Sequence, residues 1–161
     1  MKAATVNEIK QQLKVNNQAQ LIELLVRLAR FKKENKELLT YLLFEADDLD
    51  AFIKNVKDQL DEEFTSVQKG SLYYAKKTLR KILRIANKYI RYAGSETAEV
   101  EILVHYLARF RDLELALHKS TALGNLYKAQ LKKLSGALDK MHEDLRYDYL
   151  KALRKLQDVR T

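Results

Sequence analysis

Apolar residues recur at helical spacing along almost the whole chain. Between Gln18 and Phe31 they occupy positions 21, 24, 25, 28 and 31, and leucines from Leu38 to Leu43 repeat the pattern after the polar bridge 32–36. Spacings of three and four residues place such side chains on one face of a helix. With a short helix expected at about Val6–Lys14, this segment predicts an N-terminal helical hairpin.

Two glycine–serine pairs divide the middle of the chain into helices. Gly70-Ser71 and Gly94-Ser95 each join a residue that favours a helix C-terminus to one that favours an N-cap. They predict a helix at about 71–93. An acidic helix that begins at Asp47 or Asp48 should precede it, and a helix that begins at about Glu96 should follow it.

The C-terminal third repeats apolar residues at a spacing near 3.5. The run extends from Tyr127 to Leu156 and passes through Gly136. It predicts one long C-terminal helix, because a buried seam of this length could absorb the cost of about 1 kcal/mol for a glycine in a helix. The alternating stretch Leu113–Leu117 is expected to be helical too, with two buried sides. The prediction is an all-α fold, a compact bundle of about seven helices with an N-terminal helical hairpin and a long C-terminal helix.

Composition supports one helical core over residues 1–161. The 161 residues include no proline, no cysteine and only four glycines, so residues that interrupt helices are nearly missing and disulfides are excluded. No apolar run reaches the length of a signal peptide or a membrane span. We therefore expect a single all-helical domain with a cytoplasmic location and no membrane partner.

Charge gives the sequence its one functional lead. The chain carries a net charge of +8, and the segment from Gln68 to Gly94 contains eight basic residues and no acidic one. On a helix, the seven basic residues from Lys76 to Arg91 fall within an arc of about 140°, and apolar residues fill the opposite side. We call these seven residues the basic stripe. Its members are Lys76, Lys77, Arg80, Lys81, Arg84, Lys88 and Arg91.

The basic stripe is suited to a polyanion, because several cationic head groups at spacings of three and four can face a row of phosphates. Tyr73 lies in the same arc and could stack on a base. The candidate binding residues are Tyr73, Lys77, Arg80, Lys81, Arg84, Lys88 and Arg91. Three other interpretations remain open: a solvated face, a membrane-surface role, or pairing with the acidic helix at 47–63, whose seven acids and two lysines carry a net charge of −5.

Catalytic and metal sites are not indicated. The three histidines, His105, His118 and His142, lie near acidic residues, but not at the Glu-x-x-His spacing of di-metal bundles. Glu114 falls within the apolar stripe of its predicted helix, and we expect the core to have opened at that helix end. Phosphate-loop, nucleophile-elbow and calcium-loop motifs are missing. We therefore predict no enzyme activity, no cofactor and no metal.

The sequence predicts a non-enzymatic binding or scaffold protein. Its basic helix at about 71–93 is the candidate surface for nucleic acid or another polyanion. The alternative is a structural or assembly protein that acts through helix–helix packing of its C-terminal helix, with a second copy or a protein partner. A near-heptad seam is the feature that favours this alternative.

Overall fold

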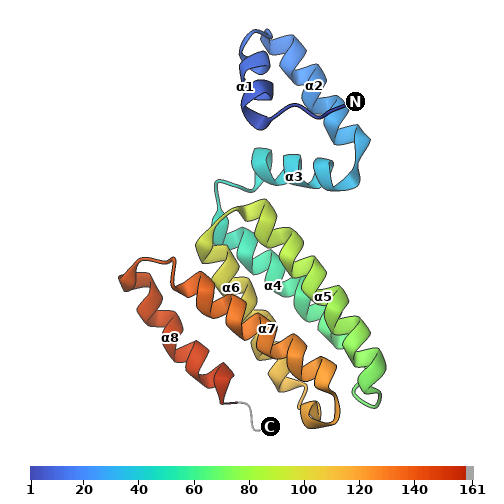
Figure 1. Cartoon of the computed structure of the whole chain (residues 1–161), viewed down its shortest axis with the longest axis vertical. Coiled ribbons are helices and arrows are strands. Elements are labelled where there is room, and N and C mark those ends of the chain that lie inside the picture. Colours follow the sequence, from blue (N-terminus) through green and yellow to red (C-terminus); the bar gives the residue numbers. More distant parts are fainter. Residues whose placement is uncertain (159–161) are drawn as a thin grey trace. The chain divides into compact units, whose positions relative to one another are not determined.

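The structure is a computed structural model that describes residues 1–158, and these residues form only helices and connecting turns (Figure 1). The all-α prediction is confirmed, with eight α-helices where about seven were expected. The helices are α1 (Val6–Lys14), α2 (Gln18–Phe31), α3 (Lys33–Phe44), α4 (Leu49–Thr65), α5 (Leu72–Ala93), α6 (Glu96–Asp112), α7 (Thr121–Leu138) and α8 (Glu143–Gln157), and a 3₁₀ turn, η1, covers Leu117–Lys119.

The chain divides into two compact units, Met1–Phe44 and the remainder from Glu45. In the first unit, Thr5 and Asn17 begin α1 and α2 with capping boxes that satisfy free backbone N–H groups. Helices α2 and α3 pack against each other, and the Asn35 side chain donates a hydrogen bond of 2.9 Å to the Leu28 carbonyl. Only Tyr41 is buried among residues 1–44, so this unit has a very small core.

The second unit is a helical bundle built around α6. This helix contacts α4, α5, α7 and α8, and its fully buried residues lie on several sides. They include Val100, Ile102, Leu103, Tyr106 and Leu107, each with no exposed surface. Because α6 is covered from several directions, its apolar residues are not confined to one stripe.

The ends of α5 are where the two glycine–serine pairs predict them. Ser71 caps the N-terminus, and Gly94 ends the helix in a left-handed conformation with φ of 57°. A side chain at Gly94 would be strained at this angle, so the glycine terminates the helix at little cost. Ser95 then caps α6.

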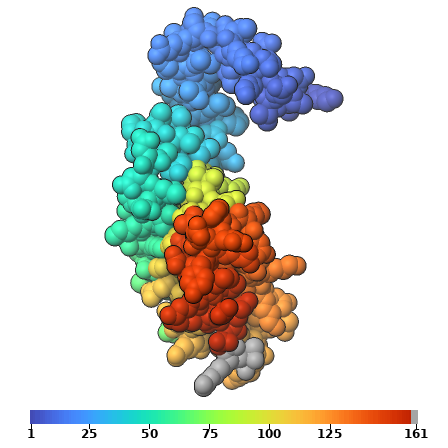
Figure 2. Space-filling model, turned by 90° about the vertical axis from the view of Figure 1, so that its left-hand side faces the viewer, coloured from blue at the N-terminus to red at the C-terminus, as the bar shows by residue number. Residues whose placement is uncertain are grey.

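The prediction of one long C-terminal helix is wrong. Helix α7 ends at Leu138, residues 139–142 turn the chain, and His142 caps α8 by accepting a hydrogen bond from the Asp144 N–H at 3.4 Å. Helix α8 then packs on α6 and α7 and lies at the surface of the second unit (red in Figure 2). The apolar spacing continues across the turn because both helices bury their apolar faces in one core.

The prediction of helix over Leu113–Leu117 is also wrong. Helix α6 ends at Asp112, and Glu114 adopts a positive φ of 52°, which an α-helix cannot contain. Glu114 itself is exposed, as expected for a helix end where the core has opened. The alternation arises because this segment is a connection in which the leucines are half-buried.

Candidate functional site

The basic stripe lies on the outer side of α5, opposite the face that anchors the helix. Leu79, Ile82 and Ala86 have no exposed surface and fix α5 in the bundle, where it contacts α4 and α6 along its length. Six buried residues in 22 hold this helix rigidly, since each contributes apolar contacts to the core. The cationic side chains therefore project from a helix whose opposite face is buried in the bundle.

The structure exposes most of the predicted site residues. Those that are exposed are Tyr73, Lys77, Arg80, Lys81, Arg84 and Arg91, and Lys88 is half-buried. The Lys88 ammonium lies 4.7 Å from the ring centroid of Tyr89 and 5.9 Å from that of Tyr92. Six of the seven residues are thus open to solvent on one helix.

The acidic helix α4 meets one flank of the basic stripe. Lys81 Nζ lies 2.7 Å from a Glu63 carboxylate oxygen. Asp61, by contrast, is directed to α6, where it pairs with His105 and Arg109 at 2.8 Å each. Two acids of α4 therefore pair with different neighbouring helices.

Four of the exposed cations of the basic stripe have no acidic partner within residues 1–158. They are Lys77, Arg80, Arg84 and Arg91. Lys77, Arg84 and Arg91 follow at intervals of seven residues, or about 10.5 Å along a helix that rises 1.5 Å per residue. This spacing lets an extended anionic chain contact them in succession.

A shallow groove runs along α5, and Lys81 is not among its lining residues. It has a volume of about 670 Å³, and its lining comes from one helix face. The lining residues are Tyr73, Lys76, Lys77, Arg80, Leu83, Arg84 and Asn87. At one end, Lys133 of α7 donates a hydrogen bond of 2.7 Å to the Asn87 side chain, and it also lies 3.5 Å from Glu99. The groove thus carries four cations and no acid in its lining.

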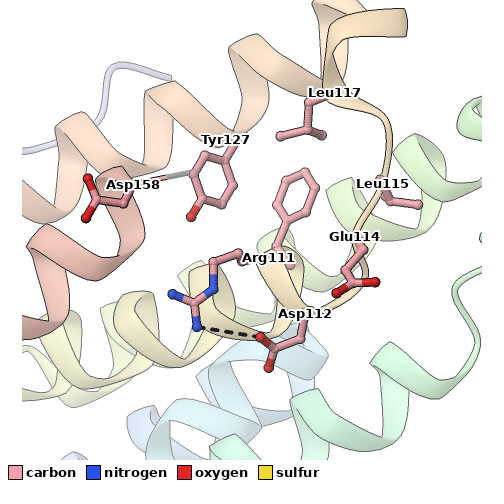
Figure 3. Close-up of a pocket in the computed structure, with 8 residues that line it drawn as sticks. Arg111, Asp112, Glu114, Leu115, Leu117, Tyr127 and Asp158 are labelled. Carbon is pink, nitrogen blue, oxygen red and sulfur yellow. Dashed lines mark ion pairs between the residues drawn. The ribbon is translucent and has the colours of Figure 1, made fainter. Parts of the chain in front are cut away.

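A second hollow lies where α6, α7 and α8 meet near Asp158 (Figure 3). It has a volume of about 370 Å³, and the side chains of Leu117 and Tyr127 point toward it. Arg111 lies at its edge, paired with Asp112 at 3.6 Å. Arg111 and Tyr127 also donate hydrogen bonds to α8 carbonyls, so these groups are already used to hold the last turn of that helix.

A polar network between α4, α6 and α8 was missed by the sequence analysis. Glu101 accepts hydrogen bonds from Lys57 and from the Tyr149 hydroxyl, and it is only about one quarter exposed. Burial on its own would raise the pKa of Glu101, but these two hydrogen bonds and the charges of Lys57 and His105 outweigh it, so the pKa is lowered. One signal was present, since Lys57/Asp61 and Glu101/His105 are each four residues apart and so share a helix face.

The histidines do not converge on one centre. His105 lies on α6 against Asp61, His118 is exposed in η1, and His142 caps α8. Residues 1–158 contain no group of three or more His, Asp or Glu side chains placed to hold a metal ion. Over the same residues, every helix is too short or too polar to span a bilayer.

Comparison with known proteins gives no relative to guide the assignment: no family model matches the chain, and neither a curated protein nor a solved structure matches it.

Proposed function

We propose that this protein is a non-enzymatic binding or scaffold protein that contacts nucleic acid through the basic stripe on α5. The observation that carries the proposal is the solvent exposure of Lys77, Arg80, Arg84 and Arg91 on a helix whose other face is locked in the core. Cations in a row on one helix gain affinity for a phosphate backbone by releasing its counterions. No reacting group is required in this mechanism.

Two features favour nucleic acid over a membrane surface. A helix that binds in the bilayer interface inserts its apolar face into the lipid, but the apolar face of α5 is buried against α4 and α6. Tyr73 is also two-thirds exposed beside the cations and offers an aromatic ring to a base. In this proposal α5 contacts the phosphate backbone and the faces of bases but not the base edges. Binding should therefore be nearly independent of base sequence.

Charge reversal with a matched control tests the proposal. Arg80→Glu combined with Arg84→Glu changes the charge by four units within the groove, and Lys151→Glu combined with Arg154→Glu makes the same change at exposed positions of α8. With a fluorescein-labelled 20-nucleotide strand in about 50 mM salt, we expect the first pair to reduce affinity at least tenfold more than the second. Equal losses would indicate a general charge effect and would remove α5 as the binding surface.

An assembly role is the second candidate, and the first unit favours it more than the C-terminal helix does. Most of the Tyr127–Leu156 seam is used inside the bundle, although Leu145 is 53% exposed. In Met1–Phe44, by contrast, nine apolar side chains between Ile22 and Phe44 are each at least 41% exposed: Ile22, Leu24, Leu25, Val26, Leu28, Phe31, Leu42, Leu43 and Phe44. Soluble monomers rarely expose so dense an apolar set.

The occupant we propose for this surface is a second copy of the chain. A unit of 44 residues with one buried side chain is near the size below which folding usually needs oligomerisation or another support. A stable dimer covers about 800 Å² on each partner, and an aromatic side chain alone can supply about 150–250 Å². Light scattering should report a dimer that Leu25→Glu with Leu28→Glu converts to monomer, while Leu145→Glu does not. A monomeric wild-type chain at micromolar concentration would exclude this role.

A further inference from the structure

An exposed aromatic pair lies at the N-terminal end of α5, beside the groove. Tyr73 is 65% exposed and Tyr74 is 53% exposed. Their ring centroids are 5.3 Å apart with an interplanar angle of 80°, so each ring braces the other edge to face. Two adjacent tyrosines this exposed are not needed by the core, which α5 completes with other residues.

One tyrosine of this pair, Tyr73, is followed along α5 by the cations of the groove. Tyr73 itself lines the groove, and the Lys76 ammonium lies 5.6 Å from its ring centroid. Lys77, Arg80 and Arg84 continue along the same helix face. A planar group stacked on the face of Tyr73 opposite Lys76 would therefore have one positive charge across the ring and three more along the groove.

An exposed aromatic ring beside cations favours unpaired over paired nucleic acid. In a duplex the faces of each base are covered by neighbouring base pairs, whereas an unpaired base can turn its π-face to an aromatic side chain. A groove that follows the backbone with cations and presents a stacking ring is the arrangement by which proteins hold single strands.

We infer that the ligand of the basic stripe is single-stranded nucleic acid, with one unpaired base stacked on Tyr73 and the adjoining phosphates at Lys77, Arg80 and Arg84. The inference rests on the proposed function and adds the strandedness of the ligand. Base identity is not read, because every base has a π-face.

The test compares two probes on four proteins. A fluorescein-labelled 20-nucleotide oligothymidylate and a 20-base-pair duplex are titrated by anisotropy in about 50 mM salt. The proteins are wild type, Tyr73→Ala, Tyr73→Phe and, as a control at another exposed tyrosine, Tyr147→Ala, whose ring is 78% exposed on α8. Circular dichroism confirms that each variant keeps its helix content.

Wild type should prefer the single strand. Tyr73→Ala should weaken single-strand binding about 5-fold to 150-fold, the range for the loss of one stacked base, and leave duplex binding within about twofold. Tyr73→Phe should bind as wild type does, because the ring and not the hydroxyl makes the contact. Tyr147→Ala should change neither probe.

Three results would overturn the inference, and they can be distinguished. If Tyr73→Ala binds the single strand as tightly as wild type while the Arg80/Arg84 reversal still abolishes binding, the stacking role is wrong and the proposed function stands. If the duplex binds wild type as tightly as the single strand does, the strand preference is wrong and the proposed function stands. If neither probe binds wild type, the proposed function and the inference fail together.

Discussion

Tyr127→Phe tests how the outermost helix is held. The last carbonyls of a helix have no donor within the helix, and α8 meets this need with side chains from its neighbours. The Tyr127 hydroxyl donates to the Leu156 carbonyl at 2.9 Å, and an Arg111 N–H donates to the Lys155 carbonyl at 3.2 Å. Tyr127 is 3% exposed and Leu156 is 2% exposed, so water does not readily replace the lost hydroxyl.

The magnitude follows from leaving a buried acceptor unpaired. The substitution removes only the oxygen, and an unsatisfied buried carbonyl costs about 1–3 kcal/mol. We expect a loss of about 1–2 kcal/mol, because a carbonyl at a helix end can partly relax toward solvent. For a bundle of this size the melting temperature should fall by roughly 3–10 °C.

The same substitution has a signature at alkaline pH. Burial raises the pKa of Tyr127 from 10.0 to about 12. The charge of Arg111 opposes this increase, and the charge of Asp112 adds to it. Between these values the unfolded chain has lost the proton and the folded chain keeps it, so stability must fall as pH rises through this window. Tyr127→Phe should make that fall shallower.

Urea unfolding followed by circular dichroism at pH 7 and at several pH values from 9 to 12 measures both effects, and hydrogen exchange locates the loosened helix. Tyr147→Phe is the control, since that ring is 78% exposed. We expect the control to lie within about 0.5 kcal/mol of wild type, as surface substitutions do. If Tyr127→Phe is as stable as Tyr147→Phe and α8 exchanges no faster, the Tyr127 hydroxyl does not hold this helix.

Three further predictions concern stability. Glu101→Gln should lower the free energy of unfolding by about 1–3 kcal/mol in urea at pH 7, because it weakens hydrogen bonds in a half-buried network. Since the pKa of Glu101 is lowered from 4.5, the carboxylate stabilises the fold at neutral pH and this contribution is lost as pH falls below about 4.5. The stability of the variant should therefore depend less on pH in the acid range. Gly136→Ala should raise stability by about 0.4–1 kcal/mol, because Gly136 is exposed in α7 with open space around it, whereas Gly94→Ala at φ of 57° should lower stability by about 1 kcal/mol in the same assay. If residues 1–161 behave as the single domain that composition suggests, calorimetry should record one transition; separate transitions for Met1–Phe44 and the bundle would show that the two units unfold independently.

Local signals in the sequence were enough to place most helices. Capping residues and glycine–serine pairs act through contacts within a few residues, so α1, α2 and the ends of α5 could be predicted from sequence alone. The buried face of α5 followed from periodicity, because this helix turns one face to the core.

The errors came from features that depend on distant contacts. The break between α7 and α8 leaves the apolar spacing intact, since both helices serve the same core, and periodicity could not separate one helix from two. The left-handed turn at Glu114 carries no glycine to mark it. The Glu101 network required knowledge of which helices are neighbours, which a pattern within one helix does not give.

The basic stripe also combines a local feature with one that depends on distant contacts. Its one-sided charge was evident from the sequence, but which of its cations are paired with acids was not. Lys81 meets Glu63 on α4, while Lys77, Arg80 and Arg84 border an open groove. Only the packing of α5 between its neighbours decides which cations are already paired.

The most direct test of the central claim is the salt dependence of nucleic-acid affinity. If Lys77, Arg80, Arg84 and Arg91 each contact a phosphate, the logarithm of the association constant for a 20-nucleotide single strand should fall with the logarithm of salt concentration at a slope near −2.8, or about −0.7 per contact. The Arg80→Glu and Arg84→Glu pair should reduce the slope to about half that value. Absence of binding at about 50 mM salt, or a slope that the charge reversal leaves unchanged, would contradict the account.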